Sequence, residues 1–254
     1  MPRPERSFRT AAIILKRRNF GEADRLLTLL TPEHGKIDGI AKGARKTTSS
    51  KPGHVELFTR ADVLIHKGRN LDIVVQAELV DPYLGLREDL QRGAYASYTA
   101  ELLDRFTETG DDDLGELFGL LANTLQRLCQ EKDPRLVIRY YEMRLLDAVG
   151  FRPELNECVV SRETIQPEDQ FFSYAGGGAV RSPYAHQIES AVPISLPALK
   201  LLRHMQRSPY EQVRNLDVSL KLHDEVERIL LGYLTHLLER QLQSVDFIRR
   251  IRHK

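Results

Sequence analysis

The sequence predicts an α+β fold, in which a small N-terminal β-barrel of the OB type precedes an α-helical domain. Two observations carry this prediction. Apolar residues recur with a period of two through the first eighty residues, which is the spacing of half-buried strands. After Pro82 the period changes to the three-and-four spacing of amphipathic helices. The change predicts two domains, residues 1–82 and residues 83–254.

The strand signal is clearest at residues 55–65, where alternate positions are apolar or small. A second run at 71–80 follows the turn residues Lys67-Gly68-Arg69-Asn70, so the two runs predict a hairpin. Shorter strands are expected at 11–15, 25–31 and 36–41. Five short strands in this length are typical of a small OB-type barrel.

The helical pattern covers residues 95–106, 114–128, 134–149 and 222–238. Asp133 followed by Pro134 has the form of an N-cap with proline at the first helical position, and Gly150 is a suitable stop. Between the helices, residues 151–194 hold four prolines and the run Gly176-Gly177-Gly178. This stretch predicts a loop-rich insert with a short hairpin at 170–180.

Charge is distributed unevenly along the chain. The formal net charge of the 254 residues is only +1, yet residues 1–80 hold 15 Lys and Arg against 9 Asp and Glu. Residues 81–134 hold 5 against 12. Such asymmetry often marks a binding surface for an anionic partner. No signal peptide or membrane span is visible, so we expect a cytoplasmic protein that does not engage a membrane.

Two basic clusters lie in the predicted barrel. One is Lys16-Arg17-Arg18 at the end of the first strand, and the other is the five cations between Lys36 and Lys51. Residues 43–53 are rich in Gly, Ser, Thr and Pro and predict a mobile loop. Such a loop suits salt-sensitive tracking of a phosphate backbone, although cationic loops are also often merely solvated.

Enzymatic functions lack their motifs. The chain contains neither a phosphate-binding loop of the Walker type nor a dinucleotide fingerprint, and its eight histidines are scattered without a metal-ligand spacing. We therefore expect no catalytic residue and no cofactor. The two cysteines, Cys129 and Cys158, do not form a disulfide framework.

Several segments together resemble the RecO family of bacterial DNA repair and recombination mediators, and they follow the family's order along nearly the whole chain. These segments are residues 21–45, 68–73, 76–78, 86–90, 94–98, 141–146, 150–155 and 158–160. The resemblance implies an OB-fold barrel followed by a helical domain with a zinc-finger-like insert. It also implies binding to single- and double-stranded DNA, strand annealing, recombinase loading with RecR, and contact with single-stranded-DNA-binding protein in a nucleoid-associated setting.

The insert departs from the family pattern. Family members often carry two Cys-x-x-Cys pairs there, and a tetrahedral zinc site needs four ligands. Here Cys158 is followed three residues later by Ser161, and the second pair is replaced by Arg181-Ser182-Pro183-Tyr184. We therefore expect a degenerate zinc-finger-like insert without a metal, held together by Phe171, Phe172 and Tyr174.

The hypothesis from the sequence is a non-enzymatic mediator whose barrel binds DNA. Aromatic residues are scarce in the barrel, so charge should contribute more than base stacking. The expected DNA-binding residues are Lys16, Arg17, Arg18, Arg25, Lys36, Lys42, Arg45, Lys46, Lys51 and Arg69. The alternative is a protein–protein adaptor that does not bind DNA directly. The basic C-terminal residues 249–254 fit either a solvated helix end or an extension of the DNA surface.

Overall fold

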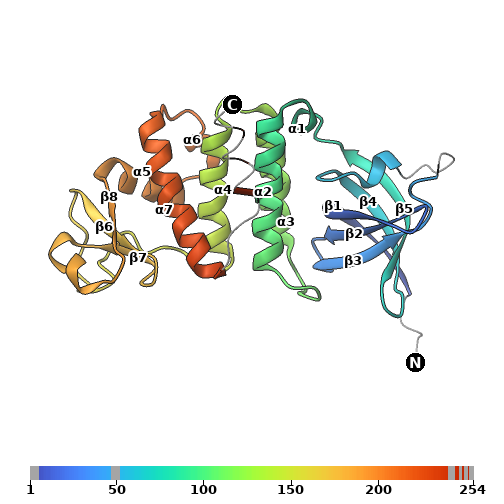
Figure 1. Ribbon diagram of the computed structural model, residues 1–254, viewed down its shortest axis with the longest axis horizontal. Coiled ribbons are helices and arrows are strands. Elements are labelled where there is room, and N and C mark those ends of the chain that lie inside the picture. The colour runs from blue at the N-terminus through green and yellow to red at the C-terminus, as the bar shows by residue number, and fades with distance from the viewer. Residues whose placement is uncertain (1–5, 47–51, 240–243, 246–247, 249–250, 252–254) are drawn as a thin grey trace. The chain divides into compact units, whose positions relative to one another are not determined.

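The computed structural model describes residues 6–46, 52–239, 244, 245, 248 and 251. The chain divides into two compact units, one formed by residues 1–130 and 244–254 and the other by residues 131–243. Strands dominate the N-terminal part and helices the remainder (Figure 1), so the predicted α+β class is confirmed. Among the helices of the described residues, none combines the length and the apolar character needed to cross a membrane.

Five strands of the first unit close into a barrel in the order β1-β2-β3-β5-β4. They are β1 (Ser7–Phe20), β2 (Asp24–Leu30), β3 (Lys36–Ala41), β4 (Arg60–His66) and β5 (Asp72–Asp81). The parallel pairing of β3 with β5 completes the ring at Gly39 and Asp72. A Cβ atom on Gly39 would lie only 3.2 Å from the Asp72 carbonyl oxygen, so a small residue permits this close approach.

The long strand β1 pairs with two neighbouring strands, β4 and β2. Its first half pairs with β4 and its second half with β2, and an extra residue, Leu15, interrupts the second ladder between Ile14 and Lys16. Just before and at this bulge the strand is buried from Ala12 to Leu15, with Ile14 in the barrel core; after it, all residues from Lys16 to Phe20 are exposed. The bulge therefore marks the point where β1 leaves the core and presents its basic run to solvent.

Two strand boundaries differ from the prediction. The first strand extends well beyond the expected 11–15, and the expected strand at 55–65 begins only at Arg60. Phe58 has a φ of 63°, a left-handed value that a strand residue does not adopt. Val55 and Thr59 are nevertheless fully buried, which explains why their alternation resembled a strand.

Helices α1 (Gly85–Glu88), α2 (Leu90–Phe106) and α3 (Gly115–Gln130) belong to the same compact unit as the barrel. The Asp89 side chain caps α2 by accepting hydrogen bonds from the amides of Gln91 and Arg92. The Asp104 side chain near the end of α2 contacts Lys16 and Lys36 of the barrel, as described below.

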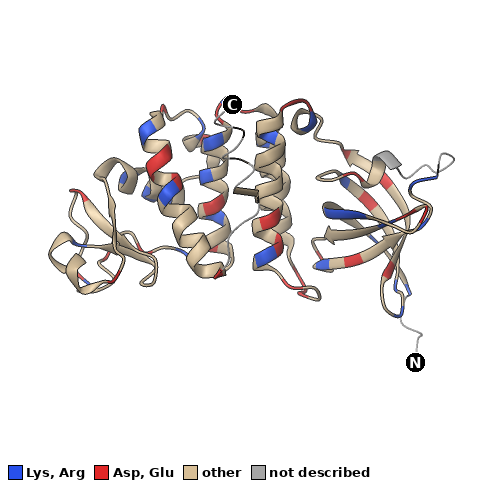
Figure 2. Ribbon diagram, viewed as in Figure 1, with Lys and Arg blue, Asp and Glu red and all other residues tan. Residues whose placement is uncertain are grey.

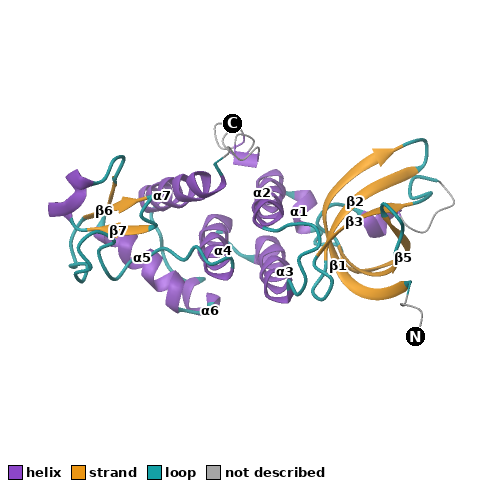
Figure 3. Ribbon diagram, turned by 90° about the horizontal axis from the view of Figure 1, so that it is seen from below, coloured by secondary structure: helices purple, strands orange, loops and turns teal. Residues whose placement is uncertain are grey.

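The second unit is built on α4 (Pro134–Ala148), α5 (Leu196–Arg207), α6 (Tyr210–Val213) and α7 (Leu220–Leu238) (Figure 3). The predicted N-cap is confirmed, since the Asp133 carboxylate accepts from the amides of Arg135 and Leu136. Gly150 has a φ of 82° just after the helix, as expected of a C-terminal stop. Helix α5 was not predicted.

The insert of the second unit contains a three-stranded sheet in the order β7-β6-β8. Strands β6 (Gln170–Ser173) and β7 (Gly178–Val180) form the predicted hairpin, whereas β8 (Val192–Ile194) was not predicted. Phe172 is fully buried, and its ring centroid lies 5.9 Å from that of Tyr174 and 5.6 Å from that of Tyr233 on α7. The expected aromatic packing is therefore present, with Phe171 only half-buried.

Candidate nucleic-acid interface

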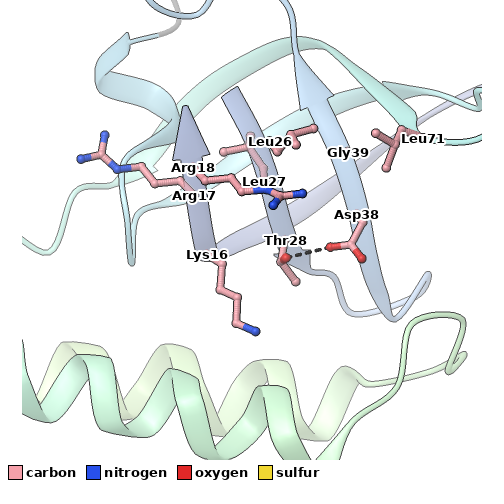
Figure 4. A pocket seen from close by; sticks show the side chains of 9 residues that line it. All are labelled: Lys16, Arg17, Arg18, Leu26, Leu27, Thr28, Asp38, Gly39 and Leu71. Atoms are coloured by element: carbon pink, nitrogen blue, oxygen red, sulfur yellow. Dashed lines mark hydrogen bonds between the residues drawn. The ribbon is translucent and has the colours of Figure 1, made fainter. Parts of the chain in front are cut away.

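A cavity of about 490 Å³ lies beside the exposed half of β1. Lys16, Arg17 and Arg18 line it from β1, together with side chains of β2 and β3 and with Leu71 (Figure 4). The guanidinium groups of Arg17 and Arg18 extend to opposite sides, and Lys16 points towards the helices (Figure 4). The structure thus brings the first predicted basic cluster to an accessible hollow in the barrel surface.

Carboxylates already form ion pairs with several of the predicted DNA-binding residues. The Nζ of Lys16 lies 2.5 Å from an Asp104 oxygen, and Glu56 pairs with both Arg17, at 2.6 Å, and Arg25, at 2.9 Å. Within the part of the chain that the structure describes, Arg18 has no ion pair. Basic and acidic residues are interspersed over the barrel (Figure 2), so the surface is less positive than its cation count indicates.

Asp38 places one further negative charge in the same cavity. One of its oxygens accepts a hydrogen bond from Thr28 at 2.7 Å (Figure 4), and the other accepts from Thr109 at 3.4 Å. The Asp38 carboxylate would repel a phosphate group. The cavity is therefore bipolar, with cations along β1 and an anion on β3.

The second basic cluster begins with an ordered turn rather than the mobile loop that the sequence predicts from residue 43. The Gly43 amide donates to the Asp24 carboxylate at 2.7 Å, and the Arg45 amide donates to the Ala23 carbonyl at 2.8 Å. These bonds tie the turn to the connection between β1 and β2, and Gly43 adopts a left-handed φ of 65° within it. Lys42, Arg45 and Lys46 are all exposed on this turn. The predicted residue Lys51 lies outside the described residues.

Lys36 is not available to a ligand, and this corrects its prediction as a DNA-binding residue. It is 7% exposed, and its Nζ donates to the Thr107 carbonyl at 2.5 Å and to the Asp104 carbonyl at 2.8 Å. The same nitrogen lies 3.3 Å from an Asp104 carboxylate oxygen. Lys36 is therefore a buried charge that ties β3 to the end of α2.

Arg69 lies exposed on the turn between β4 and β5, beside a second cavity of about 420 Å³. The two cavities share Asp38 and Leu71 and so adjoin. Sequence reasoning treated the neighbouring Lys67 only as a turn residue, yet its Nζ lies 5.8 Å from the centre of the Phe8 ring. Phe8 in turn packs against His34, with ring centroids 4.0 Å apart. The two cations in the turn sequence Lys67-Gly68-Arg69 were the signal that could have identified Lys67 as a residue of the basic surface.

Across the described ranges, no group of three or more His, Cys, Asp or Glu side chains is placed to hold a metal ion. In the insert, Cys158 is fully buried, which by itself raises the pKa of its thiol, but hydrogen bonds from Ser161 and from backbone amides outweigh burial and lower it. The other three positions of the zinc pattern carry a serine, an arginine and a tyrosine, so the residues present do not fit a zinc ion.

Comparison with known proteins gives a consistent result. The model of the family described as Recombination protein O N terminal matches residues 6–83, and that described as Recombination protein O C terminal matches residues 87–246. A protein of Roseiflexus sp. named DNA repair protein RecO is 41% identical over 98% of this chain and 87% of its own length. Proteins of the same name from Pelotomaculum thermopropionicum and Dehalococcoides mccartyi are 36% and 32% identical, each over 96% of this chain and at least 94% of their own length.

Proposed function

Because this chain belongs to the recombination protein O (RecO) family, we propose that it acts in DNA repair as a mediator of recombination. In this proposal the closed barrel is an OB fold whose basic surface binds single- and double-stranded DNA. The protein holds and presents nucleic acid and catalyses no covalent reaction.

One observation carries the DNA-binding proposal. Arg18, Lys42, Lys46 and Arg69 are exposed and have no ion pair among the described residues, and the Arg45 guanidinium beside them donates to the Gly21 carbonyl at 3.3 Å. Cations without protein partners gain most from a polyanion, because each phosphate contact releases condensed counterions from the DNA. The binding surface therefore consists of the exposed end of β1 and the two turns at 42–46 and 67–71.

The same surface predicts weak sequence preference. Phosphate contacts position a nucleic acid but carry no base information. The barrel offers one exposed aromatic side chain beside the basic run, Phe20, which is 52% exposed at the end of β1. One aromatic side chain for base stacking, surrounded by basic residues, suits binding of single-stranded DNA of any sequence.

Strand annealing follows from charge neutralisation in this proposal. Two complementary strands repel one another, and a shared cationic surface lowers that repulsion. From the family we further propose that the protein loads recombinase together with RecR, contacts single-stranded-DNA-binding protein, and works in the bacterial cytoplasm at the nucleoid.

A second function, a protein–protein adaptor without DNA binding, is favoured by one feature of the cavity. Leu26, Leu27 and Leu71 line it, and carboxylates neutralise Lys16 and Arg17. Titration of a labelled single strand at low and at high salt separates the two functions. The DNA-binding proposal expects tight binding at low salt that weakens steeply with added salt, whereas an adaptor would show no binding at either concentration.

A further inference from the structure

Two segments of the insert meet where a zinc-finger-like insert would hold its ion. The first is the loop 156–165, which folds back on itself through the Cys158 amide to the Glu163 carbonyl at 2.8 Å and the Ile165 amide to the Asn156 carbonyl at 2.8 Å. The second is the segment 179–184 after the hairpin. The Cys158 sulfur joins them by accepting from the amides of Ser161, at 3.5 Å, and Arg181, at 3.4 Å.

A carboxylate, rather than a set of thiolates, lies at the centre of this junction. One oxygen of Glu163, Oε2, accepts from the Ser161 hydroxyl at 3.1 Å and from the Tyr184 hydroxyl at 3.2 Å. The Arg181 guanidinium forms an ion pair with the same oxygen. Ser161, Arg181 and Tyr184 are the residues that stand at the three cysteine positions missing from this chain.

The local backbone explains how Glu163 reaches this place. Arg162 has a φ of 62°, so the chain reverses direction between Ser161 and Glu163. The reversal turns the Glu163 side chain back over the loop, towards Arg181 on the other segment.

We propose that the Glu163 carboxylate replaces the metal ion in this insert and closes it by hydrogen bonds and one ion pair. The charges agree with this role. A zinc ion is bound by electron-pair donors such as thiolates and neutral imidazoles, whereas the anion Glu163 is surrounded by one cation and two hydroxyl donors. Cys158 keeps its buried position as the anchor of the loop, and the three substituted positions change from ligands of a cation to donors to an anion.

The proposal predicts that the insert folds without metal and depends on Glu163. The first measurement is hydrogen exchange of the Cys158 and Ile165 amides in the full chain, with and without a chelator of divalent metals. We expect no change on chelation. Glu163→Gln should speed exchange at these amides about two- to fivefold, the size expected for a half-exposed ion pair with hydrogen bonds.

Two controls make the test specific. Glu157→Gln removes the same charge from the same exposed loop without touching the junction, and it should leave exchange unchanged. The effect of Glu163→Gln should be smaller in an Arg181→Met background, because that background already lacks the ion pair while the two hydroxyl donors remain. Faster exchange after chelation, zinc retained in stoichiometric amount by the purified protein, or equal effects of Glu163→Gln and Glu157→Gln would each overturn the proposal.

Discussion

The Nζ of Lys16 lies 2.5 Å from Oδ2 of Asp104, so a cation of the proposed DNA surface is already paired with a carboxylate of α2. The Lys16 side chain is 59% exposed, and exposed pairs of this kind contribute little to stability. A phosphate group can therefore take the place of Asp104, but only by giving up the existing contact. The basic residues of the barrel fall into two classes, paired and unpaired, that should respond differently to DNA.

Arg18→Ala should weaken single-strand binding more than Lys16→Ala. Arg18 gains a phosphate contact without losing an ion pair. Its removal should therefore make the negative slope of log K, the association constant for DNA, against log salt shallower by about 0.7. Lys16 exchanges one anion for another, and its removal should change the slope by less. Fluorescence anisotropy at several salt concentrations measures both slopes. Equal changes for the two variants would mean that the Asp104 contact does not persist in solution.

Lys36→Ala should destabilise the first unit without altering DNA binding. The substitution leaves the Asp104 carboxylate, only 14% exposed, without its buried partner. Breaking a buried pair by removing one member costs about 3 kcal/mol, and this is the upper limit here because Lys16 still pairs with Asp104. Urea unfolding of this variant and of Lys42→Ala, an exposed lysine of the same barrel, measures the difference. Similar midpoints for the two variants would show that Lys36 is not the structural residue described above.

Gly232→Ala should destabilise the second unit because Tyr174 of the insert packs against α7 at that position. A Cβ atom on Gly232 would lie 2.2 Å from the Tyr174 hydroxyl oxygen. Overpacking of this kind costs about 1–3 kcal/mol, whereas alanine in an unobstructed helix is favoured over glycine. In a Tyr174→Ala background the same substitution should therefore become neutral or stabilising. If Gly232→Ala still lowers the free energy of unfolding in the Tyr174→Ala background, the added methyl group clashes with a residue other than Tyr174.

The contact between Asp133 and His223 predicts a pH dependence. Burial raises the pKa of Asp133, but the hydrogen bond and charge of His223, 2.9 Å away, and two backbone amides outweigh it, so the pKa lies below the ordinary 3.8. A carboxyl whose pKa is lower in the folded state stabilises the fold above its unfolded pKa, and this contribution disappears as the pH falls through the lowered value.

Asp133→Asn keeps the helix cap but removes that contribution. The variant should be less stable than the parent by about 1 kcal/mol at pH 5, and the difference should shrink as the pH falls through the lowered pKa of Asp133. Urea midpoints at pH 5 and at successively lower pH values provide the measurement. A difference that stays constant with pH would indicate that the carboxylate charge is not the cause.

Local patterns predicted much of the fold. The hairpin around residues 173–178, the cap at Asp133 and the stop at Gly150 each depend on residues close in sequence. Helix α5 was missed although its signals were present, since Ser195 caps it and Pro197 lies in its first turn. The long second half of β1 lacks alternation because neither of its faces is buried, so no periodic signal could reveal it.

The site was less accessible to sequence reasoning. Lys36 and Lys42 look equivalent in the sequence, yet one lies under the end of α2 and the other in solvent. Likewise, no local pattern connects Glu56 with Arg17 and Arg25, or Asp104 with Lys16. These pairings arise from contacts between residues distant along the chain, and they decide which cations remain available.

The most direct test of DNA binding by the barrel is the salt dependence of single-strand affinity after Lys42, Arg45 and Lys46 are changed together to alanine. All three are exposed on one ordered turn, so the variant should fold normally. The control removes three exposed cations of the second unit, Lys200, Arg207 and Lys221. We predict a weaker affinity and a slope reduced by about 2 for the turn variant, with little change for the control. Unchanged affinity and slope in the turn variant would contradict a DNA-binding role for this surface.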